Sequence, residues 1–86
     1  MKLPLTFKGD REALEDILDH EGVSGHWSSE PNGVHCLRLK NGAGLHWSTT
    51  TGALWCDGPA KAAQRLEGQV LMALHWLAFR DVHSPA

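Results

Sequence analysis

The stretch VSGHWSSEPNGVHCLRLKNGAGLHWSTTTGALWCD, residues 23–57, decides the fold. Apolar and polar residues alternate along it with the period of two that β-strands show. Three glycine-containing segments interrupt the alternation: residues 31–33 (Pro-Asn-Gly), 40–42 (Lys-Asn-Gly) and 50–52 (Thr-Thr-Gly). Each is typical of a tight hairpin turn. The stretch therefore predicts four consecutive antiparallel strands.

The turns also predict which side chains share a face of this sheet. If glycine takes the left-handed position of the first two loops, Leu37 lies between Trp27 and Leu45 on neighbouring strands. The resulting apolar face consists of Trp27, Leu37, Leu39, Leu45, Trp47, Leu54 and Cys56, with His35 at its margin. The opposite face, called the open face below, presents His26, Ser28, Cys36, Arg38, Lys40, His46, Trp55 and Asp57.

The segment before this stretch predicts one more strand and a helix. Apolar residues alternate from Leu3 to Phe7, and Pro4 favours the edge of a sheet because proline cannot donate a ladder hydrogen bond. Asp10 is a suitable N-cap for a helix that ends before Gly22, a residue suited to a left-handed cap.

The segment after it predicts a second helix. Pro59 is expected at the first helical position, and the helix should continue to about Arg80. The order β-α-β-β-β-β-α then predicts an α+β fold, in which a five-stranded antiparallel sheet carries two helices on one face. Residues 1–86 are too few for more than one domain.

The segment from Leu45 to Pro59, LHWSTTTGALWCDGP, and the helix that follows it carry a family resemblance. Together with the element order, it resembles TBP-like domains, among them the small N-terminal accessory domain of some type III bacterial ribonucleases H. It is also similar to short proteins of bacteriophages and mobile elements. The resemblance is strongest over residues 43–70 and implies a curved sheet whose open face is left uncovered. Asp57 stands where such sequences often have glutamine, which disfavours contact with nucleic acid.

Composition excludes several classes of protein. No run of apolar residues is long enough to cross a bilayer, and the N-terminus lacks the apolar region of a signal peptide, so we expect a cytoplasmic protein without membrane contact. If the chain is phage-encoded, this is the host cytoplasm. Cys36 and Cys56 are then expected as free thiols.

The net charge of −2 is unevenly distributed. Between Asp10 and Glu21, six acidic residues face a single cation, Arg11. The acidic face of this first helix consists of Glu12, Glu15, Asp16 and Asp19. It is interpreted either as an ordinary solvated helix face or as a surface that steers a basic partner.

The open face allows several functions. His26, Arg38, Lys40, His46, Trp55 and Asp57 form its candidate binding site. Arg38 and Lys40 beside Trp55 are residue types that suit phosphate contact with base stacking. The other readings of this face are an ordinary solvated surface and a docking surface for a protein partner. His26, Cys36 and His46 point the same way, but no metal-binding spacing motif is present, and we expect neither a metal nor another cofactor.

An enzyme is not expected. Cys36 and His46 are predicted to be cross-strand neighbours, but Asp57 should stand too far along the next strand to complete a nucleophilic triad. No catalytic residue is therefore predicted.

The second helix has more apolar residues than one sheet can bury. From Val70 to Phe79 every residue except His75 is apolar, which leaves Met72, Trp76 and Phe79 outside the stripe that faces the sheet. The first helix and the tail from Asp81 to Ala86 are one possible cover. The alternative that we predict is a homodimer with this helix at its centre.

These expectations favour a non-catalytic protein-interaction module. The resemblance to phage proteins implies an accessory or inhibitor, of the anti-CRISPR type, that acts on a bacterial nucleic-acid-handling or defence machine. The alternative is an accessory domain that binds nucleic acid through the open face.

Overall fold

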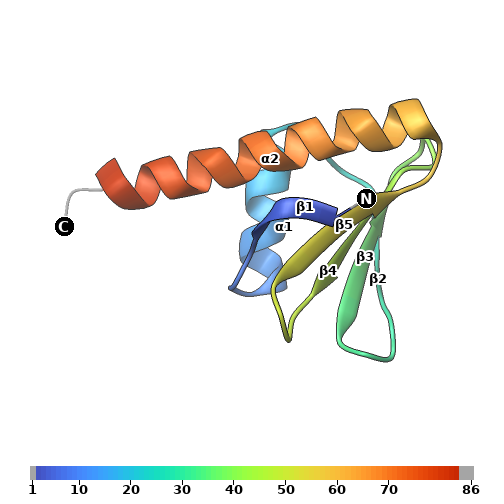
Figure 1. Cartoon of the computed structure of the whole chain (residues 1–86), viewed down its shortest axis with the longest axis horizontal. Coiled ribbons are helices and arrows are strands. Elements are labelled where there is room, and N and C mark those ends of the chain that lie inside the picture. The colour runs from blue at the N-terminus through green and yellow to red at the C-terminus, as the bar shows by residue number, and fades with distance from the viewer. Residues whose placement is uncertain (1, 84–86) are drawn as a thin grey trace.

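The computed structural model describes residues 2–83, apart from the side chains of residues 2, 4, 5 and 78–83. Its elements follow the predicted order (Figure 1). They are β1 (Lys2–Thr6), α1 (Arg11–His20), β2 (His26–Ser29), β3 (Val34–Arg38), β4 (Gly44–Ser48), β5 (Ala53–Asp57) and α2 (Ala60–His83). The α+β class, the antiparallel sheet and the two helices are confirmed.

The strands pair in the order β1-β5-β4-β3-β2. Strands β2 to β5 form a regular antiparallel meander, whereas β1 joins the free edge of β5 through an irregular register. The predicted register of the meander is correct, because Leu37 pairs with both Trp27 and Leu45. Gly33 and Gly42 have φ angles of 74° and 91°, the left-handed conformation that the loops were expected to need.

Helix α1 is held by the caps that the sequence indicated. The side chain of Asp10 accepts a hydrogen bond of 2.8 Å from the backbone N–H of Ala13. At the other end Gly22 has a φ of 75°, and its N–H donates to the carbonyl of Asp19. The helix directs Leu14 and Leu18 into the core and leaves its acidic side towards solvent.

Helix α2 differs from its predicted limits at both ends. It begins at Ala60, with Pro59 one residue before it, and continues past Arg80 to His83. A helix of 24 residues is about 36 Å long, close to the 40 Å long axis of the molecule. Its C-terminal end, red in Figure 1, therefore extends beyond both the sheet and α1.

The core lies between the sheet and the two helices. The predicted apolar face forms one side of it, with Leu45, Trp47 and Leu54 almost fully buried and Trp27 and Leu39 at its periphery. Helix α2 contributes Leu66, Val70, Ala73 and Leu74 from the other side. Because both helices pack on this face, the open face of the sheet remains available for other contacts. Neither described helix combines the length and apolar character needed to span a membrane.

Candidate functional site on the open face

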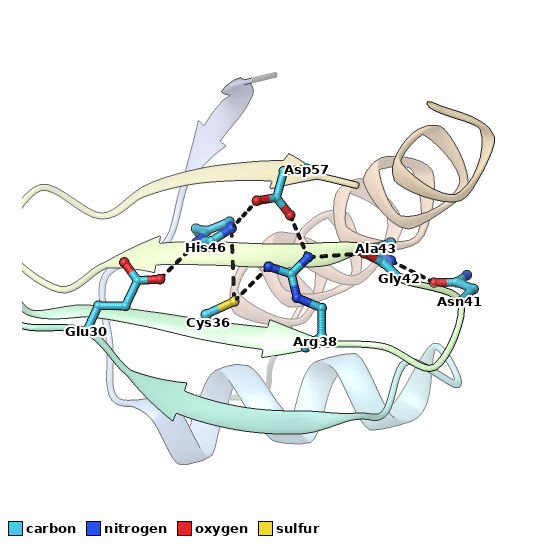
Figure 2. A network of polar contacts seen from close by, with 8 residues as sticks. All are labelled: Glu30, Cys36, Arg38, Asn41, Gly42, Ala43, His46 and Asp57. Atoms are coloured by element: carbon cyan, nitrogen blue, oxygen red, sulfur yellow. Dashed lines mark hydrogen bonds and ion pairs between the residues drawn. The ribbon is translucent and has the colours of Figure 1, made fainter. Parts of the chain in front are cut away.

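A polar cluster lies on the open face, over the middle strands of the meander (Figure 2). Its best-defined contact is an ion pair of 2.9 Å between Nη1 of Arg38 on β3 and Oδ1 of Asp57 on β5. The same Arg38 nitrogen donates to the carbonyl of Gly42 at 3.1 Å. The guanidinium is thus held at two points near the end of β3.

Gly44 on β4 explains why Arg38 and Asp57 can meet. It pairs with Arg38 on one side and with Asp57 on the other, so a side chain here would stand between them. A Cβ atom at Gly44 would lie 2.5 Å from Arg38 Nη1 and 2.7 Å from Asp57 Oδ1. The gap left by glycine therefore lets two strands that are not neighbours form an ion pair.

His46 is the centre of the cluster and is only 8% exposed. Its Nε2 lies 2.8 Å from Oδ2 of Asp57, and its Nδ1 lies 3.6 Å from Oε1 of Glu30. The indole ring of Trp55 stacks on the imidazole, with ring centroids 5.3 Å apart and an interplanar angle of 4°. Since an ionised carboxylate can only accept, Nε2 carries a hydrogen and donates it to Asp57.

Cys36 lies beside His46 and is 5% exposed. Its Sγ is 4.0 Å from His46 Nε2 and 3.9 Å from Arg38 Nη2. Burial raises the pKa of the Cys36 thiol above its ordinary value, and the nearby Arg38 guanidinium offsets only part of that effect. Cys36 is therefore a thiol at neutral pH.

The carboxylate of Asp57 is stabilised in its charged form. Partial burial acts to raise its pKa, but the hydrogen bonds from His46 and Arg38 outweigh that effect and leave the pKa below its ordinary value. The hydrogen bond to Asp57 likewise raises the pKa of Arg38. The two groups remain oppositely charged across the physiological range.

The structure brings together four of the six predicted open-face residues, namely Arg38, His46, Trp55 and Asp57. His26 and Lys40 are exposed and lie apart from this cluster, in a shallow groove lined by residues 24–26 and 39–41. Glu30 was not predicted as a site residue. Its signal was available in the alternation, because residue 30, directly after β2, continues the spacing of His26 and Ser28.

One geometric expectation was wrong. Asp57 was predicted to stand too far from His46 for a triad, yet the two are in direct contact. The contacts still do not form a nucleophilic relay, because Cys36 and Asp57 both approach Nε2. A nitrogen that donates its hydrogen to Asp57 cannot also accept the thiol proton.

The other two predicted surfaces lie on the helices. On α1, Glu12, Asp16 and Asp19 are exposed, and Glu15 forms an ion pair of 3.5 Å with Arg11. On α2, Met72 and Trp76 are exposed by 51% and 53%. The side chain of Phe79, the third predicted interface residue, lies outside the described residues.

A groove lies between the two helices next to Trp76. Its lining consists of Ile17, His20, Glu21, Ala73, Trp76 and Leu77, and its volume is about 510 Å³. This lies within the range of about 300–1,000 Å³ that is typical of binding pockets. Its lining is largely apolar, and the polar part comes from His20 and Glu21 at the end of α1.

Comparison of the chain with protein-family models, with curated proteins and with solved structures gave no match.

Proposed function

We propose that the chain is a non-catalytic protein-interaction module that pairs with a second copy of itself through α2. The observation that carries the proposal is the exposure of Met72 and Trp76, at 51% and 53%. Among the described residues these are the large apolar side chains that remain exposed. Adjacent exposed apolar residues that continue a buried helix face are a common mark of an interface.

The shape of α2 supports a second copy as the partner. The C-terminal part of the helix extends beyond the sheet (Figure 1). An isolated helical segment is only marginally stable in water. Trp76 also lines the groove between α1 and α2. A two-fold axis would place the Trp76 of each copy against the groove of the other, which makes the patch self-complementary.

A wider role follows from the sequence resemblance alone. We extend the proposal to a phage-type accessory protein or inhibitor, of the anti-CRISPR type, that acts on a bacterial nucleic-acid-handling machine. The genes beside the coding sequence test this extension: phage or mobile-element genes would support it, and a conserved housekeeping operon would oppose it.

The alternative function, nucleic-acid binding by the open face, has weaker support. Arg38 is already neutralised by Asp57, and one face of the Trp55 ring is occupied by His46. Glu30 adds a further negative charge beside them. Phosphate contacts would make binding steeply dependent on salt concentration, so a shallow or absent salt dependence with single-stranded DNA or RNA opposes this alternative.

Sedimentation equilibrium tests the dimer. The variant Met72→Glu places a carboxylate in the proposed interface and should weaken dimerisation at least tenfold, because burying an unpaired charge is costly. The control Gln64→Glu makes the same charge change at an exposed position near the start of α2 and should leave the dimer unchanged. A wild-type chain that stays monomeric well above micromolar concentrations would refute the proposal.

A further inference from the structure

The cluster on the open face contains three different metal-ligating groups. Glu30, Cys36 and His46 each offer one donor atom, and these atoms lie within 4.8 Å of one another. Donors of a tetrahedral zinc site are separated by about 3.3–3.7 Å, given bonds of about 2.0–2.3 Å. The donor atoms must therefore approach one another by about 1 Å. Glu30 can contribute by a change of its side chain, which is 46% exposed. Cys36 and His46, with Sγ 4.0 Å from Nε2, must also move slightly closer.

The contacts of His46 also favour a cation at this point. Asp57 accepts the hydrogen of Nε2, so in the neutral imidazole Nδ1 carries a lone pair. That lone pair is 3.6 Å from the carboxylate of Glu30, which is a second electron donor. A metal ion between the two would convert this unfavourable approach into coordination. A carboxylate that holds the other ring nitrogen is the usual outer partner of a metal-bound histidine.

We propose that Glu30, Cys36 and His46 bind a single Zn²⁺ ion, with Asp57 as a positioning residue for His46. A site made of thiolate, imidazole and carboxylate donors selects zinc over magnesium or calcium. The charges balance as well. The Cys36 thiolate, Glu30 and Asp57 contribute three negative charges, which Arg38 and a divalent ion neutralise.

Binding of Zn²⁺ releases one proton from the site. The Cys36 thiol loses its proton to solvent when the sulfur–metal bond forms, so the affinity for Zn²⁺ should rise with pH. The Arg38 guanidinium, 3.9 Å from Sγ, stabilises the resulting thiolate. Three protein donors leave a fourth tetrahedral position, which a water molecule can fill from the solvent side.

Cobalt substitution provides the test. Full-length protein freed of metal with a chelator is titrated with Co²⁺, which should bind with a stoichiometry of one and give a thiolate-to-cobalt charge-transfer band. Added Zn²⁺ should displace the cobalt and remove the band. The competition gives the affinity for Zn²⁺.

Two pairs of variants assign the donors. Cys36→Ser should abolish the charge-transfer band, whereas Cys56→Ser, which changes the other cysteine on the helix side of the sheet, should leave it intact. Glu30→Gln should weaken Zn²⁺ binding more than 10-fold, whereas His26→Gln, at an exposed histidine outside the cluster, should not change it. Asp57→Asn should weaken binding about 10–100-fold without removing the band, as expected of an outer partner.

Three results would overturn the proposal: no thiolate band in the wild type, a band that survives Cys36→Ser, or equal affinities for wild type and Glu30→Gln. If Cys36→Ser does not fold, Glu30→Gln decides the outcome, because Glu30 is exposed and its neutral isostere keeps the fold.

Discussion

The buried face of the sheet can be tested at Trp47, whose replacement by alanine should strongly destabilise the domain. Trp47 is 1% exposed at the centre of the core. Its ring meets Phe7 edge to face at 5.4 Å, and stacks on His35 at 5.5 Å. Its Nε1–H donates a hydrogen bond of 2.9 Å to the carbonyl of Phe7, which links β4 to the residue that follows β1.

The magnitude follows from these contacts. Truncating a buried tryptophan to alanine costs about 3–5 kcal/mol, and the loss of a donor to a buried carbonyl adds about 1 kcal/mol. A domain of this size has a free energy of unfolding of about 5–10 kcal/mol. Trp47→Ala should therefore remove about half of the stability or more. Trp47→Phe keeps the apolar ring and loses the donor, so it should cost only about 1–2 kcal/mol.

Urea denaturation followed by far-ultraviolet circular dichroism measures these differences, at one protein concentration for all variants because dimerisation would shift the transitions. The matched control is Trp55→Ala, which removes a partly exposed tryptophan from the open face. We expect it to cost less than about 1 kcal/mol. If Trp55→Ala proves as destabilising as Trp47→Ala, the assignment of the two faces is wrong.

The remaining predictions concern the ion pair on the open face. The pKa of Asp57 is lowered in the folded state, so Asp57 contributes stability above the unfolded-state pKa of about 4, and this contribution is lost as the pH falls through the folded-state value. When the free energy of unfolding is measured at decreasing pH, the wild type should therefore lose more stability than Asp57→Asn. Parallel curves for the two proteins would contradict the pairing. Gly44→Ala should separate Arg38 from Asp57 and raise the pKa of Asp57, which NMR can measure. The control Gly68→Ala, at an exposed helix position with open space around it, should leave that pKa unchanged and stabilise the domain by about 0.5–1 kcal/mol.

The register of the meander was predictable because two kinds of signal agreed. Glycine at positions 33 and 42 fixed the loop geometry, and the alternation of apolar residues fixed the face. A slip of one residue would have exposed Leu37, Leu45 and Trp47 together. Local turn chemistry and burial therefore specified the same pairing. Among the described strands, β1 is the one whose pairing deviates from a regular register.

The polar cluster was harder to predict because its contacts are diagonal. Cross-strand partners such as Cys36 and His46 follow from the register. Glu30, in the loop directly after β2, and Asp57, at an offset position on β5, both reach His46 diagonally. Long side chains and sheet twist make such contacts possible without any sequence spacing that would reveal them. The absence of a side chain at Gly44 was equally decisive, and no periodic pattern marks it.

The two proposed sites can be tested separately because the sheet lies between them. Met72 and Trp76 belong to α2, which packs on the apolar face, whereas Glu30, Cys36 and His46 occupy the open face. A dimer built through α2 leaves both open faces in solvent, so each copy would bind its own zinc ion. Substitutions at distant sites without shared partners act independently. Failure of the cobalt assay therefore leaves the dimer proposal intact, and a monomeric protein leaves the zinc site intact.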